Sequence, residues 1–270
     1  MAICLNDRAL VTGAASGFGL ALTRGLSERG CRVLAVDLTD ETPRTLRGLS
    51  GMRYRRLDVR SDVDWAAARE QVMADWNGLD LLVNNAGVGS GGDIDVEPIS
   101  EWERVVSINL LGVVRGCQVF APVFKDQHTG HIVNVASAAG LVHPPGMASY
   151  NAVKAGVVAL SETLHIELEP FGIATSVVCP SFFRTDIARN MAAGDAKDMA
   201  SALIDASPRT AEELAATVLT AVDAGTHLIL PDKPTRAAYL VKRFARPVYL
   251  RSLRAMAARS RARRAGAAAR

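Results

Sequence analysis

The segment TGAASGFG, residues 12–19, joins the apolar run ALVTG to a helical pattern that continues to about residue 29. Its three glycines, Gly13, Gly17 and Gly19, leave out side chains where the backbone has to approach a pyrophosphate. A helix that begins in such a loop offers free N–H groups and the positive end of its dipole to the phosphates. The G-x-x-x-G-x-G spacing also suits a tight packing turn. The position of the loop between a strand and a helix is what predicts a dinucleotide-binding turn.

Strand-like and helix-like segments alternate along the first 232 residues, which is typical of a parallel sheet covered by helices on both faces. We therefore expect an α/β fold with a doubly wound, mostly parallel seven-stranded sheet of the Rossmann type. In such sheets, ligands bind beside the carboxyl ends of the strands. Ser100 and Thr210 are candidate N-caps of two helices. The predicted strands cover residues 9–13, 31–37, 53–59, 79–87, 130–137, 173–181 and 227–232, and the predicted helices cover residues 19–29, 61–78, 100–125, 147–172 and 210–225.

The segment YNAVK, residues 150–154, places Tyr150 and Lys154 on one face of a predicted helix. Free tyrosine has a pKa near 10, so it becomes a useful base near pH 7 only if its phenolate is stabilised by about 4 kcal/mol. A close ammonium and a positively charged nicotinamide ring can supply that stabilisation in a desolvated site. The chain has 5 lysines against 26 arginines, and a lysine here provides a compact charge that a planar guanidinium does not. The spacing therefore predicts a tuned general base.

Several motifs, taken together and in order, resemble the short-chain dehydrogenase/reductase family. They are TGAASGFG at 12–19, NNAG at 84–87, Asn109, Ser137 and YNAVK at 150–154. The resemblance runs over residues 8–232. It implies hydride transfer between the carbon of a secondary alcohol or ketone and C4 of a nicotinamide cofactor.

The resemblance also gives the expected catalytic residues, Asn109, Ser137, Tyr150 and Lys154, one role each. Tyr150 takes the hydroxyl proton as general base, and Ser137 holds the substrate oxygen beside it. Lys154 tunes Tyr150 and bonds a ribose hydroxyl, and Asn109 binds a water that links Lys154 to solvent. Taken alone, Ser137 could equally form a turn and Asn109 could lie on the surface.

The cofactor expected from the sequence is NAD, with NADP disfavoured. Asp37 ends the second predicted strand, 18 residues after Gly19, where a carboxylate can accept hydrogen bonds from the adenosine ribose and repel a 2′-phosphate. Neither Leu38 nor Ser16 offers a cation that would hold such a phosphate, although an aspartate at a strand end can also simply form a turn. In the segment CPSFFRT, Ser181 replaces the glycine usual in the family. The expected cofactor-binding residues are Gly13, Ser16, Gly17, Phe18, Gly19, Asp37, Asp58, Val59, Asn85, Ala86, Gly87, Tyr150, Lys154, Pro180, Phe183 and Thr185.

Three mainly apolar loops, 88–99, 138–149 and 182–209, should shape the substrate pocket. We expect an apolar secondary alcohol or ketone, although ordinary loop packing explains the same residues. The alternatives are an NADPH-dependent 3-oxoacyl-thioester reductase, which Asp37 disfavours, and a catalytically idle NAD-binding sensor, which needs no tuned tyrosine. The expected substrate contacts are Leu141, Met147, Phe182 and Ile187, within a wider apolar set that includes Val88, Val142, Phe183, Met191 and Leu203.

The tail, residues 233–270, carries 12 basic and no acidic residues, whereas residues 1–232 carry 19 basic and 28 acidic ones. We expect residues 1–232 to form the catalytic domain and the tail to form two short amphipathic helices, interrupted near Pro247 and followed by a disordered end. A basic amphipathic segment can lie on an anionic membrane. It can also contact a partner subunit, or dock on the body and close over the pocket. Nucleic-acid binding is not expected.

The sequence carries few features that indicate the cellular compartment or the oligomeric state. The four cysteines are scattered and form no zinc-binding pattern, so we expect no metal and a reducing, cytoplasmic location, with membrane-peripheral contact through the tail as an option. We expect no signal peptide before the first predicted strand, and no apolar run that reaches the roughly 18 residues of a membrane-spanning helix. The resemblance implies a homodimer or homotetramer through the helices that carry Asn109 and Tyr150.

Overall fold

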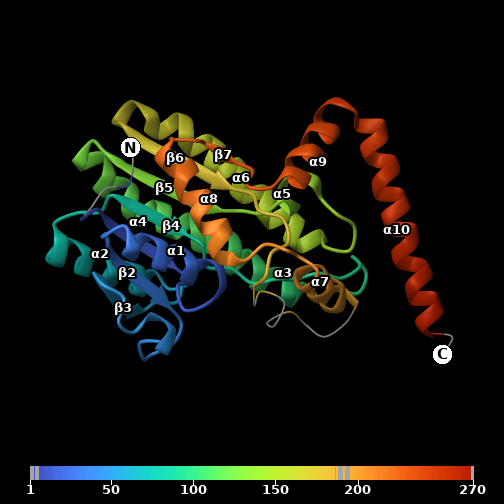
Figure 1. The fold of residues 1–270 in the computed structure, drawn as a ribbon, viewed down its shortest axis with the longest axis horizontal. Helices are drawn as coiled ribbons and strands as arrows, with labels where there is room; N and C mark the ends of the chain where they lie inside the picture. Colours follow the sequence, from blue (N-terminus) through green and yellow to red (C-terminus); the bar gives the residue numbers. More distant parts are fainter. Residues whose placement is uncertain (1–2, 4–5, 186, 188–190, 192–194, 269–270) are drawn as a thin grey trace.

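Seven parallel strands form one sheet at the centre of the computed structural model, in the order β3-β2-β1-β4-β5-β6-β7 (Figure 1). The structure describes residues 3, 6–185, 187, 191 and 195–268. The strand order reverses between β1 and β4, and the doubly wound α/β fold expected from the sequence is confirmed. The strands are β1 Arg8–Thr12, β2 Arg32–Asp37, β3 Met52–Arg56, β4 Leu81–Asn84, β5 Gly130–Val135, β6 Ile173–Val178 and β7 Leu228–Ile229.

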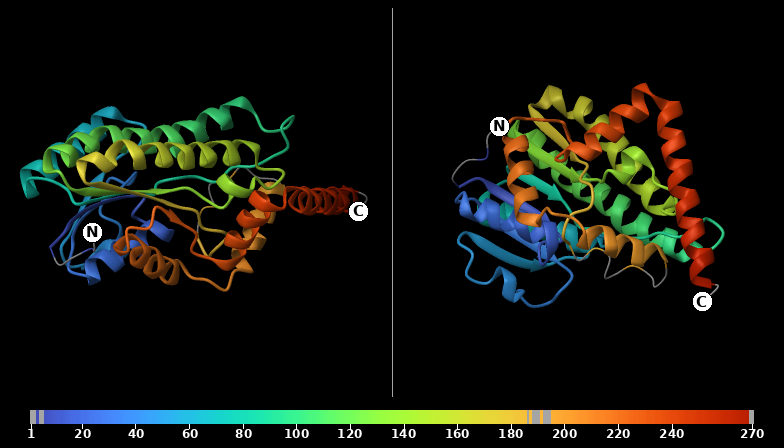
Figure 2. Two further views of the ribbon diagram at one scale, coloured as in Figure 1. Left: turned by 90° about the horizontal axis from the view of Figure 1, so that it is seen from above. Right: turned by 45° about the vertical axis from the view of Figure 1, so that its right-hand side comes forward.

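Helices cover both faces of this sheet, as the left view of Figure 2 shows. One apolar core lies between the sheet and α1 and α8, and the other lies between the sheet and α2, α4 and α6. The helices are α1 Gly17–Glu28, α2 Asp62–Trp76, α3 Ile99–Val106, α4 Gly112–Gln127, α5 Ala139–Val142, α6 Ala148–Leu168, α7 Asp195–Asp205, α8 Ala211–Asp223, α9 Lys233–Phe244 and α10 Arg246–Ala268, with short 3₁₀ turns at Arg44–Leu46 and Glu169–Phe171.

The central strands end earlier than predicted, and the segments that follow them form part of the site. The predicted strand 79–87 corresponds to β4, which ends at Asn84. The next residue, Asn85, turns back toward β1: its backbone N–H donates to Thr12 Oγ1 at 2.9 Å, and its side-chain amide donates to Thr12 O at 2.9 Å. Buried polar groups need such partners. The NNAG segment is therefore fixed beside the glycine loop.

A π-helical turn interrupts the long helix predicted over residues 100–125. Ser107–Leu111 forms the turn between α3 and α4 and contains Asn109. Ser100 is not the N-cap, because the helix begins one residue earlier, at Ile99, with Pro98 in the cap position. By length and composition alone, the stretch Ile99–Gln127 could cross a membrane, so the expectation that no apolar run is long enough was wrong. Core helices pass the same test, and here α4 packs on the sheet.

The tail differs from its prediction. It forms two helices, but the second is long: α10 continues to Ala268, where a disordered end was expected. Pro247 stands in the first turn of α10, where a missing N–H costs no hydrogen bond. The many alanines and arginines that follow are good helix formers, which accounts for the length. Figure 1 shows α9 and α10 at one end of the molecule, beside α5.

Candidate active site

A cavity of about 710 Å³ opens at the carboxyl ends of the central strands, as expected for this sheet. It brings together Ser137, Tyr150 and Lys154 with nearly all the predicted cofactor residues. Gly19 does not line it, since it lies within the first turn of α1 and faces Gly13. The predicted cofactor residues that line the cavity are Gly13, Ser16, Gly17, Phe18, Asp37, Asp58, Val59, Asn85, Ala86, Gly87, Tyr150, Lys154, Pro180, Phe183 and Thr185.

The glycine loop has room only for glycine. A Cβ on Gly13 would lie 2.9 Å from Ala86 Cα, and one on Gly19 would lie 2.1 Å from Gly13 O. Gly13 and Gly17 also have positive φ angles, +65° and +53°. The N-cap of α1, Ser16, makes no side-chain bond to the first turn. This leaves free N–H groups facing the cavity, which fits the pyrophosphate of a dinucleotide.

Asp37 joins the end of β2 to the glycine loop. Its carboxylate accepts hydrogen bonds from the backbone N–H of Ala15 at 2.8 Å and of Leu38 at 2.7 Å. Arg60, which was not among the residues predicted from the sequence, also lines this end of the cavity. Its guanidinium pairs with Asp58 at 2.6 Å and holds the pKa of that carboxyl below its usual value. The Arg60 guanidinium at this end of the cavity is therefore already paired with a carboxylate.

Tyr150 and Lys154 both lie on α6, with only 8% and 3% of their surfaces exposed. The Lys154 Nζ stands 5.8 Å from the centre of the Tyr150 ring and donates to Val135 O at 2.8 Å. Burial raises the pKa of Tyr150 to about 12, with a hydrogen bond to Ser137 acting in the opposite direction. Burial also lowers the pKa of Lys154 to about 8, with Cys179 opposing that shift. The pair is placed as predicted, but the ammonium is bonded to a carbonyl and the tyrosine pKa is raised.

Ser137 and Asn109 flank this pair from different elements. Ser137 follows β5, and its Oγ accepts the N–H of Ala139 at 3.1 Å. Asn109 is fully buried rather than on the surface, and it binds Val88 twice: Oδ1 accepts its N–H and Nδ2 donates to its O, both at 2.8 Å. Asn109 lies behind the cavity wall: a Cβ added to Gly87 would meet Asn109 Oδ1 at 3.2 Å and Lys154 Nζ at 3.7 Å.

The apolar end of the cavity contains three of the four predicted substrate contacts, Met147, Phe182 and Ile187. Leu141 is the exception: it is 7% exposed and belongs to the core, while its neighbour Val142 lines the cavity instead. A one-turn helix gives no periodicity that would distinguish these two positions. Among the lining residues missed from the sequence are Ser90, Arg104, Ile108, Ala200, Ile204, Pro234, Thr235, Ala238 and Met256.

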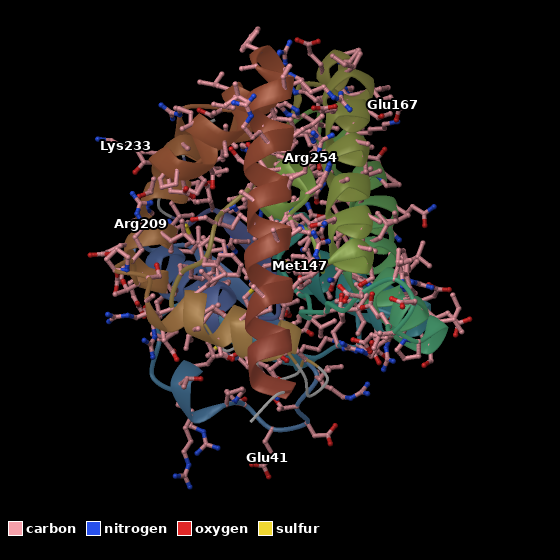
Figure 3. All side chains as sticks on the ribbon, turned by 90° about the vertical axis from the view of Figure 1, so that its right-hand side faces the viewer. Glu41, Met147, Glu167, Arg209, Lys233 and Arg254 are labelled. Atoms are coloured by element: carbon pink, nitrogen blue, oxygen red, sulfur yellow. The ribbon has the colours of Figure 1, made fainter. Side chains whose placement is uncertain are left out.

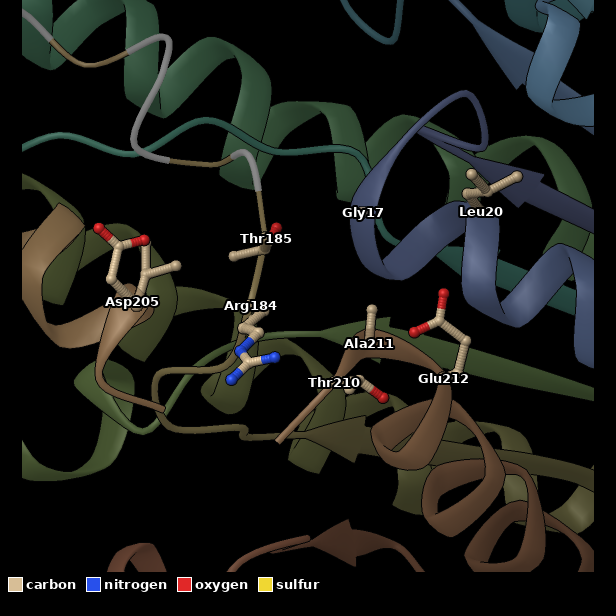
Figure 4. Close-up of a pocket in the computed structure, with 9 residues that line it drawn as sticks. Gly17, Leu20, Arg184, Thr185, Asp205, Thr210, Ala211 and Glu212 are labelled. Carbon is tan, nitrogen blue, oxygen red and sulfur yellow. The ribbon is translucent and has the colours of Figure 1, made fainter. Parts of the chain in front are cut away.

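A second, smaller pocket of about 460 Å³ flanks the glycine loop (Figure 4). It shares Gly17, Thr185 and Ile204 with the main cavity and is otherwise lined by residues such as Arg184 and Glu212. Neither Tyr150 nor Lys154 reaches it, so it does not contain the candidate chemistry. Among the described residues, no group of three or more His, Cys, Asp or Glu side chains could hold a metal ion.

A doubly wound sheet with a glycine loop and a buried Tyr–Lys pair defines a nicotinamide-dinucleotide-binding protein of the oxidoreductase type. Residues 7–196 match the family described as short chain dehydrogenase, and the chain belongs to that family. The resemblance seen in the sequence is therefore confirmed.

Several relatives are named as dehydrogenases of hydroxy compounds. The chain is 34% identical over 186 residues to 2-(R)-hydroxypropyl-CoM dehydrogenase of Xanthobacter autotrophicus, covering 66% of this chain and 74% of the relative. It is 32% identical over 179 residues to a 3-alpha-(or 20-beta)-hydroxysteroid dehydrogenase of Mycobacterium bovis, covering 66% and 69%. A short chain dehydrogenase/reductase from Burkholderia phymatum, crystallised in complex with NAD, superposes with a TM-score of 0.85 at 30% identity, covering 90% of this chain and 95% of that one.

Proposed function

We propose that this protein is an NAD-dependent oxidoreductase that interconverts a secondary alcohol and a ketone. The observation that supports this most is that Ser137 and the buried pair Tyr150 and Lys154 line the same cavity as the glycine loop. A protein that only bound a dinucleotide would have no need of an ionisable pair buried beside the nicotinamide end. Several relatives are named as dehydrogenases of hydroxy compounds, hydroxypropyl-CoM, hydroxysteroid and hydroxybutyrate dehydrogenases among them, which supports the same reaction class.

In the proposed oxidation, Tyr150 takes the hydroxyl proton and Ser137 holds the same oxygen by a hydrogen bond. Bound NAD supplies the hydride acceptor and a positive charge at the nicotinamide. The Tyr150 pKa of about 12 must fall for this role. The Lys154 ammonium is the protein's own charge placed to lower it. Asn109 fixes the backbone at Val88 and holds that wall of the site in place.

Substitution of Tyr150 by Phe tests this assignment. The ring still fills its place, but the proton acceptor is gone, so turnover of any accepted alcohol should fall by at least about 10³-fold. NAD affinity, measured by calorimetry, should stay within about threefold of the original. Substantial turnover by Tyr150→Phe would refute the proposed chemistry. If the unsubstituted protein binds NAD tightly but turns over no member of a broad panel of alcohols and ketones, the catalytically idle sensor is favoured instead.

NAD rather than NADP is the proposed cofactor, because Asp37 lines the adenosine end of the cavity and the nearby Arg60 is paired. The solved relative with NAD bound supports this choice. An NADPH-dependent 3-oxoacyl-thioester reductase is the second candidate. Measuring the dissociation constants of NAD(H) and NADP(H) separates the two.

The proposed substrate is apolar, since Met147, Phe182 and Ile187 line the end of the cavity beyond Tyr150. The hydroxysteroid dehydrogenase among the relatives supports an extended, apolar molecule. A panel in which only small polyols or sugars were accepted would contradict this part of the proposal.

We also propose a cytoplasmic homodimer or homotetramer that meets a membrane through its tail. Two exposed apolar side chains, Leu111 in the π-helical turn before α4 and Ile166 on α6, support assembly through the face formed by these helices. Size-exclusion chromatography with light scattering tests the assembly, and a monomer at micromolar concentration would contradict it.

A further inference from the structure

Pro234, Thr235 and Ala238 of α9 and Met256 of α10 line the same cavity as Tyr150. The family match ends at residue 196, so none of these residues lies in the matched region. In Figure 3, α10 runs across the side of the molecule at which Met147 is labelled, and Met147 also lines the cavity. The tail therefore adds a wall to the substrate end of the site.

The first anchor of this wall is at the start of α9. One oxygen of Asp232 accepts the backbone N–H of Thr235 at 2.8 Å, and the other accepts the N–H of Ser181 at 3.1 Å. Asp232 is 7% exposed. The carboxylate thus caps α9 and also ties it to the segment after β6, which carries Phe182 and Phe183 into the cavity.

The second anchor is on α5, the turn that follows Ser137. Lys242 of α9 donates to Leu141 O and lies 3.0 Å from His143 Nδ1, and Tyr249 of α10 donates to Val142 O. These are side-chain bonds to carbonyls at the end of a helix, groups that have no partner within the helix itself. Tyr249 is only 8% exposed.

One face of α10 is directed at the body. Tyr249, Leu253 and Met256 follow at spacings of four and three residues, which places them on the same side of a helix. Tyr249 and Leu253 are more buried than the flanking Leu250 and Arg254. Met256 is 49% exposed and lies at the edge of the cavity, where a flexible apolar side chain adapts to an apolar ligand.

We propose that α9 and α10 form the outer wall of the substrate pocket, in which Met256 contacts the far apolar end of an elongated substrate and Lys242 and Tyr249 are positioning residues that hold the α5 turn. The inference rests on the proposed alcohol–ketone activity and deepens it. It makes the tail a determinant of substrate length, because substrates too short to reach Met256 gain nothing from it.

Met256→Ala tests the contact directly, with a series of secondary alcohols from 2-butanol to 2-undecanol. Loss of a half-exposed apolar contact should lower kcat/KM for 2-undecanol about fivefold through KM, with little change for 2-butanol. Leu250→Ala is the matched control, since Leu250 is an exposed α10 residue that does not line the cavity. An identical chain-length profile for the original protein and Met256→Ala would overturn the inference.

Hydrogen exchange tests the anchors without any need for turnover. The amides of residues 140–143 are all bonded within the α5 turn, so their exchange reports opening of that turn. Lys242→Met and Tyr249→Phe should each speed this exchange about tenfold, whereas Tyr239→Phe, whose hydroxyl accepts a hydrogen bond from Arg243 at 3.3 Å, should not. Unchanged exchange in both variants would refute the anchoring. If no alcohol is turned over while the exchange rises as expected, the proposed function fails but the tail remains a wall of the cavity.

Discussion

At the scale of single residues, the site has two buried ionisable side chains, Tyr150 and Lys154, on one helix. Burial opposes charge on both: it raises the pKa of Tyr150 to about 12 and lowers that of Lys154 to about 8. A carbonyl, Val135 O, stabilises the Lys154 ammonium at 2.8 Å. The Lys154 ammonium is therefore held in a desolvated site, where it stabilises a nearby phenolate more strongly than it would in water.

Lys154→Met should show this effect in the pH dependence. Oxidation requires deprotonated Tyr150, so kcat/KM rises with pH through the tyrosine titration. Without the ammonium the phenolate is less stable, and the midpoint should move to higher pH by at least about one unit. Lys154→Arg, which keeps a charge, is the control and should shift less. Identical profiles for Lys154→Met and the original protein would mean that the lysine does not tune Tyr150.

The cofactor preference also depends on single residues. Replacing Asp37 with Ser and Leu38 with Arg removes the repulsive carboxylate and adds a cation near the ribose. We expect the ratio of kcat/KM for NADP to that for NAD to rise at least about 100-fold, roughly 2.8 kcal/mol. Asp40→Ala is the control, because Asp40 is an acidic neighbour whose side chain is 91% exposed and pairs with Arg56. Preference of the unsubstituted protein for NADP would contradict the role of Asp37.

At the scale of elements, the local sequence predicts some helix boundaries correctly and others not. Thr210 was identifiable as an N-cap because the threonine and Glu213 form a capping box. Ser100 has the same residue-level signal, but Pro98 occupies the cap position of its helix instead. The length of α10 could not be predicted, because a segment rich in alanine and arginine is typical both of a helix and of a disordered end.

Thr210→Ala measures that local contribution. Thr210 Oγ1 accepts the N–H of Glu213 at 3.2 Å, and Glu213 returns a bond to the Thr210 N–H at 3.1 Å. Losing the cap should lower the free energy of unfolding by about 1 kcal/mol in urea titrations. Thr217→Ala, at an exposed site inside the same helix, should change it by less than about 0.5 kcal/mol or stabilise slightly. Equal losses at both positions would argue against the cap.

At the scale of the whole molecule, the sequence predicted the sheet and the residues around the glycine loop, because these follow one another at strand ends. It did not predict contacts between distant segments. Met256 and Tyr249 meet the cavity wall about a hundred residues earlier in the chain, and no periodicity encodes such a pairing. The apolar positions at 249, 253 and 256 could have shown that α10 has a buried face, but not what it faces.

Exposed apolar residues of the tail carry the last prediction. Phe244 and Val248, where α9 meets α10, are 77% and 56% exposed, and the basic residues Arg243, Arg246 and Arg251 are close to them in the sequence. Phe244 and Val248 thus form an apolar tip among basic residues, and such an arrangement favours binding to anionic bilayers. The full chain should co-sediment with vesicles containing phosphatidylserine, less so at high salt and not with phosphatidylcholine alone.

Phe244→Glu should weaken this binding at least about tenfold, since it removes an inserted ring and adds a charge of the same sign as the lipid. Val63→Glu is the matched control: Val63 is 78% exposed, lies in the first turn of α2 and is far from the tail in sequence. Because both variants change the net charge equally, any difference between them belongs to the tip and not to overall electrostatics. Equal pelleting of the two variants would show that the exposed ring meets no bilayer. The inward face of α10 would then be the only one with a proposed role.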